Sequence, residues 1–453
     1  MNISISEHFN YKKILRFVIP SIFMMVFISL YGVVDGIFVS NFVGKTPFAG
    51  LNLIMPVLMM FGMFGFMIGQ GGCAIVSATF GAGDPKRANR YFSMLVYLTI
   101  GLGIFLCIIG QIVLRGIAGL LGAEGELLEC CVQYGRIYLI GIPFFMLQSV
   151  LQNFLIAAER PKIALYVTLG AGFTNIILDF LLVGVFSLGL VGAALATIIS
   201  QGVGAICPLI YFLTKNSSIL RLGKATFDFH VILKTVTNGS SELMTNISMS
   251  VVNTLYNTQL LKYFGEDGVS AYGVIMYVSF VFVAMFIGYS MGVAPIVGFN
   301  YGAKNDVELK NIFKKSLRII ICVSVGMVAL AQLLAPFVSH IFVGYDEELY
   351  KLTLFGFRIH SLAYLFAGIN IFASSFFTAL NNGVISAIIS FLRTLLFQVV
   401  LVMVLPLIFG ANGIWFSVVA ADILATVNRF FPYSKQEKIQ LLKQKTSRWE
   451  VLV

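Results

Sequence analysis

The chain is 453 residues long, and 58% of its residues are hydrophobic while only 11% are charged. Because an average soluble domain carries about 25% charged residues, this composition excludes a soluble globular protein and predicts an integral membrane protein. The formal net charge of +10 does not indicate nucleic-acid binding, because the cations fall in short loops on one side of the predicted membrane spans.

Hydropathy predicts an all-α protein that crosses the membrane with twelve helices. An even number of spans places both termini on the same side of the membrane. In chain order the spans are expected at residues 14–38, 48–72, 91–114, 131–155, 162–183, 189–213, 235–261, 269–298, 313–336, 353–380, 384–408 and 412–432.

The cations of the predicted loops fall unevenly on the two sides of the membrane. Most of the loop lysines and arginines share the side of the termini. Because cytoplasmic loops carry an excess of Lys and Arg, both termini are predicted to be cytoplasmic. The opposite side has only Lys45, Arg115, Lys262 and Lys351.

The second half of the sequence repeats the first at a constant offset of 221 residues. Glycine-rich loops match at this offset, which favours a true repeat over chance similarity of apolar sequence. Each half has six spans, so we expect two pseudo-symmetric six-helix lobes related by an axis along the membrane normal. The predicted parts are the first lobe, a cytoplasmic linker, the second lobe and a cytoplasmic tail, at residues 1–213, 214–234, 235–433 and 434–453.

The first span contains a single carboxylate, Asp35, with Tyr31 one helical turn before it on the same face. A carboxylate inside a span costs about 2.5–3.5 kcal/mol, so it normally faces protein or water and has a function. The alternative is that Asp35 serves only as a hydrogen-bonding group between helices. Pro20 interrupts the hydrogen bonds of the same span, and we hypothesise that ion binding at Asp35 bends the helix there.

The fifth span places Asn175 and Asp179 on one helical face, and the sixth supplies the hydroxyl of Thr197. Together with Asp35 these groups provide oxygen ligands for a small cation, or two carboxylates that share a proton. The spacing does not choose between the two. Hydrogen bonding between helices is the alternative explanation for Asn175 and for Thr197.

The second half has different intramembrane carboxylates. At the places of the two first-half aspartates it has Tyr256 and Val400, and its own acids are Glu242 and Asp422. Glu242, with Asn246 one turn later, is a candidate for substrate or ion binding, although helix capping or a gate contact explains it almost as well. Asp422 lies deeper in its span and is a stronger candidate. Both Asp422 and Tyr31 of the first span are predicted to line the substrate pathway, together with Glu242 and Asn246.

Other polar residues in the spans are weaker candidates. Gln152 and Asn153, near the end of the fourth span, are candidates to line a substrate pathway, with packing as the alternative. Four cations are expected near span ends, where long side chains normally extend toward the membrane surface. These are Arg136, Arg358, His360 and Arg393.

The sequence contains no His-Glu-x-x-His motif and no phosphate-binding loop of the G-x-x-x-x-G-K-[ST] type. We therefore predict that the protein is not an enzyme and has no cofactor. Without a nucleotide site, the energy for any transport comes from an ion gradient, and one charge crossing 100 mV supplies about 2.3 kcal/mol.

The sequence resembles the multidrug and toxic compound extrusion (MATE) family over essentially its whole length. The motifs that carry the resemblance are residues 34–39 of the first span, the loop at 80–86 and residues 175–179. Residues 294–304 and 239–242 are similar to the MepA-type bacterial branch. Together these motifs are specific evidence for the resemblance, whereas each motif alone is weak evidence.

The resemblance implies two six-helix lobes that export cationic and amphipathic drugs in exchange for Na⁺ or H⁺ across the bacterial inner (cytoplasmic) membrane. It places Pro20 at the helix bend, and it implies no metal beyond Na⁺ at the two aspartates. An acidic residue that some branches carry in the tenth span is missing here, which puts a second-lobe ion site in doubt. The implied cation site comprises Tyr31, Asp35, Asn175, Asp179 and Thr197.

Two other functions stay open. One is a flippase for lipid-linked oligosaccharides from the same superfamily, and the other is an uncoupled channel or receptor. Such a flippase should have a cationic central cavity that binds the diphosphate of its lipid-linked substrate. The buried ionisable groups in this sequence are instead mostly acidic. The expected partners are small-molecule drugs and the lipid bilayer, without nucleic acid, and the expected state is a monomer.

Overall fold

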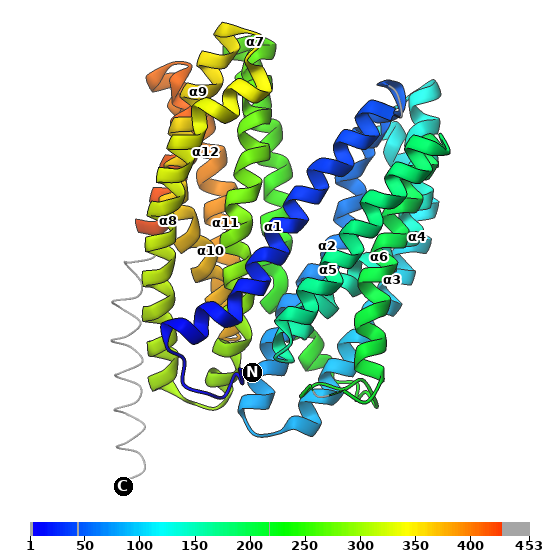
Figure 1. The fold of residues 1–453 in the computed structure, drawn as a ribbon, viewed down its shortest axis with the longest axis vertical. Coiled ribbons are helices and arrows are strands. Elements are labelled where there is room, and N and C mark those ends of the chain that lie inside the picture. The colour runs from blue at the N-terminus through cyan, green and yellow to red at the C-terminus, as the bar shows by residue number, and fades with distance from the viewer. Residues whose placement is uncertain (1–2, 43–44, 217, 428–453) are drawn as a thin grey trace. The chain divides into compact units, whose positions relative to one another are not determined.

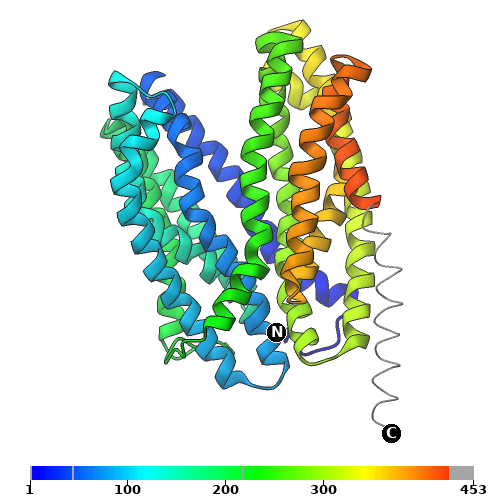
Figure 2. The ribbon, with the colours of Figure 1, turned by 180° about the vertical axis from the view of Figure 1, so that it is seen from behind.

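The computed structural model describes residues 3–42, 45–216 and 218–427, except for the side chains of 33–42, 45, 46, 48, 49 and 52. Within these residues every regular element is a helix, as the two opposite views show (Figures 1 and 2). The predicted all-α class is therefore confirmed.

The first half contains six spans, and the fifth changes from an α-helix to a π-helix within the membrane. In chain order its elements are α1 (Tyr11–Phe42), α2 (Lys45–Gly81), α3 (Pro85–Leu120), α4 (Gly125–Ala157), α5 (Pro161–Leu178), the π-helix η1 (Asp179–Val185) and α6 (Gly189–Leu213).

The second half begins with an element that merges two spans at a kink, since Gly265 inside it has φ 64° and ψ −151°. A shorter apolar helix, Asn412–Val427, ends the described chain. The labelled elements are α7 (Phe229–Gly302), α8 (Asp306–Val343), α9 (Glu347–Ser361), α10 (Tyr364–Ala379), α11 (Gly383–Phe391), the π-helix η2 (Leu392–Leu396) and α12 (Phe397–Phe409).

The number of spans agrees with the prediction. Nine helices of the described chain are long and apolar enough to cross a membrane, or ten when α9 and α10, bent by 46°, form one span. The kink at Gly265 divides α7 into two spans. With the helix Asn412–Val427 the total is the twelve expected from hydropathy.

Helix α7 begins earlier than predicted. It starts at Phe229, so the last part of the predicted linker 214–234 is helical. Asp228 caps this helix, because its side chain accepts hydrogen bonds from the backbone N–H groups of His230 and Val231. Hydropathy finds only the apolar part of a helix, and the first turns of α7 are polar.

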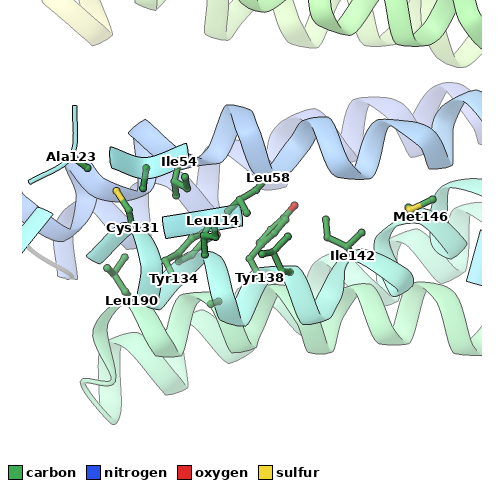
Figure 3. Packing of buried hydrophobic residues seen from close by; sticks show 13 residues of the cluster. Ile54, Leu58, Leu114, Ala123, Cys131, Tyr134, Tyr138, Ile142, Met146 and Leu190 are labelled. Atoms are coloured by element: carbon green, nitrogen blue, oxygen red, sulfur yellow. The ribbon is translucent and has the colours of Figure 1, made fainter. Parts of the chain in front are cut away.

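Helix α4 is the centre of the first half. In its most apolar stretch 78% of the residues are buried, and it packs against α2, α3 and α6. Apolar and aromatic side chains recur along α4 at every fourth residue, which aligns them on one face. The core shown in Figure 3 includes Tyr134, Tyr138, Ile142 and Met146 of α4, Ile54 and Leu58 of α2, and Leu114 of α3.

By internal packing the chain divides into two compact units. The first unit comprises Met1–Ser250, Tyr277–Ile320 and Ile371–Ser390, and the second comprises Val251–Met276, Ile321–Asn370 and the chain from Phe391 onward. The units do not coincide with the sequence repeat, because parts of the second half pack with the first half in one unit. The lobe boundaries drawn from the repeat, 1–213 and 235–433, stay a prediction.

Candidate functional site

The junction between α5 and η1 carries the most deeply buried carboxylate among the described side chains of the first half. Asp179 is the first residue of the π-helix, and its exposed fraction is 0%. Asn175 lies one turn earlier and is 2% exposed. A π-helix is rare and is often found at functional sites, because its extra residue per turn changes the direction of the side chains that follow.

Helix α1 packs along α5 and contacts η1, so the first span runs beside this junction. Tyr31 of α1 lies against Phe27, with ring centroids 5.8 Å apart, and Phe27 lies 5.5 Å from Phe173 of α5. Gly172 permits this approach, because a methyl group there would collide with the Phe27 ring. The aromatic side chains thus join α1 to α5 near the buried carboxylate. The side chain of Asp35 lies outside the described residues.

Helix α6 also packs against α5 and η1. Its Thr197 donates a hydrogen bond from Oγ1 to the carbonyl oxygen of Ala193, at 3.0 Å. A hydroxyl that donates to its own helix keeps lone pairs with which it can accept a hydrogen bond or bind a cation. The structure therefore brings together the helices that carry the predicted cation site, while the binding roles of Asn175, Asp179 and Thr197 stay a prediction.

Gln152 and Asn153 lie inside the first half, and each is 5% exposed. Gln152 Nε2 donates to Thr168 Oγ1 of α5 at 2.9 Å, and Asn153 Nδ2 donates to the carbonyl oxygen of Ser149 at 2.9 Å. These bonds give each amide nitrogen a partner within the bundle. They favour a packing role over the predicted role in a substrate pathway.

Glu242 and Asn246 lie one turn apart on α7, within the first compact unit. Asn246 Nδ2 donates to the backbone carbonyl oxygen of Glu242 at 2.8 Å. Glu242 is thirteen residues into α7 and not at its first turn, which is capped by Asp228. Its position therefore disfavours helix capping as its role.

The second half contains a buried polar cluster that sequence reasoning found only in part. Asp422 Oδ1 accepts hydrogen bonds from Arg393 Nε at 2.9 Å and from Asn370 Nδ2 at 3.1 Å. Thr426 Oγ1 lies 3.2 Å from Asn370 Oδ1. The side chains of Arg393 and Asp422 are 17% and 4% exposed, so they form an ion pair that is largely buried.

The expectation that Arg393 and His360 extend toward the membrane surface is wrong. Arg393 lies in the π-helix η2 and pairs with Asp422, while His360 is 7% exposed. The sequence itself argues against a surface position for Arg393, because this residue lies well inside the predicted span 384–408. A cation at that depth needs a partner, and Asp422 is that partner.

Tyr256, which aligns with Asp35, belongs to a neutral network in the second unit. Its hydroxyl donates to Gln398 Oε1 at 2.9 Å and lies 2.8 Å from Ser417 Oγ. Its ring stacks on Tyr272, with centroids 5.3 Å apart. The second half thus has phenol, amide and hydroxyl groups where the first half has a carboxylate. The two halves differ in chemistry at corresponding places.

A serine-hydrolase motif occurs in the sequence, but not in the structural setting that its chemistry requires. Residues 288–292 read Gly-Tyr-Ser-Met-Gly, which matches the nucleophile pattern of serine hydrolases. They lie inside α7 and not at a strand-to-helix turn, so the match is not a nucleophile elbow. Among the residues whose side chains are described, no group of three or more His, Cys, Asp or Glu has the arrangement of a metal site.

A family model named MatE matches the chain twice, at residues 20–181 and 243–404. The two matches cover most of the chain and fall one in each half, as an internal repeat requires. The chain belongs to the MATE family. MATE proteins are membrane transporters and not enzymes, in agreement with the sequence prediction.

Curated MATE relatives align over nearly the full chain. The "Multidrug export protein MepA" of Staphylococcus haemolyticus (strain JCSC1435) is 25% identical over 440 residues, covering 96% of this chain and 95% of that protein. The protein of the same name from Staphylococcus aureus (strain MSSA476) is 24% identical over 425 residues, covering 92% of each. The similarity to the MepA-type branch is thus confirmed.

Solved MATE structures share the fold. The structure described as "Crystal structure of MATE in complex with MaL6" has a TM-score of 0.90 and 23% sequence identity, and the match covers 96% of this chain and 98% of that chain. The chain therefore has the MATE fold of twelve membrane helices in two pseudo-symmetric halves.

Proposed function

We propose that this protein is a secondary active multidrug efflux antiporter that exports cationic and amphipathic compounds in exchange for Na⁺ or H⁺. The observation that carries the proposal is the fully buried Asp179 at the start of η1, with Asn175 one turn before it. The relatives named multidrug export proteins support the substrate class.

The buried position of Asp179 gives a physical basis for coupling. A charged carboxylate within the membrane is costly, and a bound proton or Na⁺ offsets that cost. Loss of the ion leaves a carboxylate that a cationic drug can neutralise in its place. Ion and drug therefore stabilise different states of the first half, and one charge crossing 100 mV supplies about 2.3 kcal/mol to drive the exchange.

Asp35 and Tyr31 complete the proposed site from α1, and Thr197 completes it from α6. Pro20 lies inside α1 and is proposed as the position at which this helix bends when the ion binds or leaves. The protein is proposed to act as a monomer in the bacterial inner membrane with both termini cytoplasmic, because the loop cations favour that orientation.

The two alternatives are less favoured by the described side chains. A flippase for a diphosphate needs cations that bind phosphate, whereas Arg393 is already paired with Asp422. In an uncoupled channel or receptor, the energetic cost of a completely buried carboxylate such as Asp179 would serve no function.

The proposal is tested with purified protein in liposomes, by following ethidium transport under an imposed Na⁺ gradient or an imposed proton gradient. One of the gradients should drive transport against the ethidium gradient, and Asp179→Asn should reduce it by more than about tenfold, which corresponds to about 1.4 kcal/mol. Asp35→Asn should behave in the same way. Asp306→Asn, at an exposed position of α8, is the control.

Two results would contradict the antiport proposal. Normal gradient-driven export by Asp179→Asn would remove this carboxylate from the mechanism. Ethidium movement that follows only its own concentration gradient in the wild type would favour the channel.

A further inference from the structure

Three polar side chains lie on one exposed face of helix α7 just before its kink. Thr254, Asn257 and Thr258 are spaced at three and four residues, so they share a face, and all three are exposed. Polar side chains that face lipid are costly, because lipid offers them no hydrogen-bonding partners. The Thr258 hydroxyl is bonded within the helix, since its Oγ1 donates to the carbonyl oxygen of Thr254 at 2.8 Å, so the Asn257 amide is the group of this face that most favours contact with water.

The same face borders a cavity within the second compact unit. Its volume is about 500 Å³, and it is open at the protein surface, because all of its lining residues but Val269 are exposed. Residues from both sides of the kink at Gly265 contribute to it. The lining comprises Thr254, Asn257, Thr258, Leu261, Glu266, Val269 and Ser270.

Glu266 is the one ionisable group among these lining residues. The neighbouring Asp267 does not line the cavity, and the Lys262 ammonium lies over the Tyr263 ring, 5.4 Å from its centroid. The remaining polar groups are hydroxyls and one amide, whose oxygens accept hydrogen bonds. The cavity thus combines a carboxylate with neutral acceptors, an arrangement that attracts cations.

We propose that this cavity is a binding subsite for the charged group of an organic cation, such as a protonated amine. Glu266 supplies the counter-charge, the oxygens of Asn257 and Ser270 accept hydrogen bonds from the cation, and Leu261 contacts its apolar part. The subsite lies beside the kink between the first two spans of the second half, on the side that the loop cations predict to be outside. It is a release site for exported cations, and in this respect it rests on the proposed efflux function.

The first test measures the affinity of purified full-length protein for ethidium, a fluorescent organic cation. Glu266→Gln should raise the Kd about three- to fivefold, as expected for the loss of one partly exposed charge interaction. Asp267→Asn removes the same charge one residue away and should change the Kd less than about twofold. Equal effects of the two substitutions, or no effect of Glu266→Gln, would overturn the proposal.

The second test does not depend on transport. Thr258→Cys, at a lining position that is given no contact with the cation, is introduced after the native cysteines have been replaced, and its modification by cationic and anionic methanethiosulfonate reagents is timed. The cationic reagent should react faster, ethidium should slow the reaction, and Glu266→Gln should reduce the preference for the cationic reagent. Lack of protection by ethidium would overturn the subsite even if gradient-driven export is normal. Protection without export under any gradient would instead support the subsite and contradict the antiport function.

Discussion

Gly81 of α2 and Gly302 of α7 each face the backbone of the other's helix. A methyl group on Gly81 would collide with the carbonyl oxygen of Phe299, and one on Gly302 would collide with that of Ala78. Gly81 and Gly302 are separated by the 221-residue offset of the sequence repeat, and so are Ala78 and Phe299. The contact is therefore symmetric with respect to the repeat. Glycine allows the two backbones to approach this closely, because any side chain would separate them.

Gly302→Ala should therefore destabilise the first compact unit by about 1–3 kcal/mol, as overpacking typically does. Thermal unfolding in detergent would measure the loss, and Gly81→Ala should act similarly. Gly326→Ala in α8 is the matched control, because a methyl group there meets nothing within 4 Å. Equal stability of Gly302→Ala and Gly326→Ala would show that the crossing tolerates a side chain.

The N-terminal segment is anchored on α8 by Glu308. The carboxylate of Glu308 accepts a hydrogen bond from the backbone N–H of Phe9 at 2.9 Å and lies 2.7 Å from His8 Nδ1. Asn311 Nδ2 donates to the same carboxylate at 2.9 Å, and Phe9 is completely buried. Glu308→Gln should lower stability by about 1.5–3 kcal/mol, because the amide has no charge and only one acceptor oxygen where the carboxylate uses two.

Limited proteolysis near the N-terminus, together with thermal unfolding, would measure the effect of Glu308→Gln. Asp306→Asn, two residues earlier on the same helix and exposed, should change neither. If Glu308→Gln leaves both the cleavage rate and the unfolding temperature at wild-type values, these bonds do not hold the segment.

Because Arg393 and Asp422 form an ion pair, the stability losses caused by substituting each of them should not be additive. Arg393→Met or Asp422→Leu alone should destabilise the protein by about 3–5 kcal/mol, because each leaves a buried charge without its partner. The double substitution should recover most of the loss, which a double-mutant cycle from thermal unfolding would show. Arg358→Met, at an exposed position of α9, is the control. Simply additive losses would mean that the two charges are not coupled.

Pro20 lies inside α1, which continues as one helix from Tyr11 to Phe42. Pro20→Ala restores a backbone N–H that can bond to the carbonyl of Arg16, so it should favour the unbent helix and reduce ethidium export. Pro85→Ala, at the first position of α3 where proline breaks no bond, should export normally. Full export by Pro20→Ala, with unchanged labelling of a cysteine at Leu30, would rule out bending at Pro20.

The sequence alone was sufficient for the membrane class, the twelve spans, the repeat and the choice of Asp179 as a candidate. Each of these depends on local or periodic information. Span length and hydropathy follow from the thickness of the bilayer, the repeat is a fixed offset along the chain, and a carboxylate within an apolar stretch is unusual wherever the helix packs.

Only the tertiary structure showed the partner of Arg393, the packed bonds of Gln152 and the change to a π-helix at Asp179. The partner of Arg393 was not predictable from the sequence, because the ion pair joins residues 29 positions apart on different helices, and no local pattern reports which helices pack together. The close backbone contact of Gly81 with Gly302 was unpredictable for the same reason. Hydropathy decides which segments enter the membrane, whereas side-chain packing between those segments decides which polar groups meet.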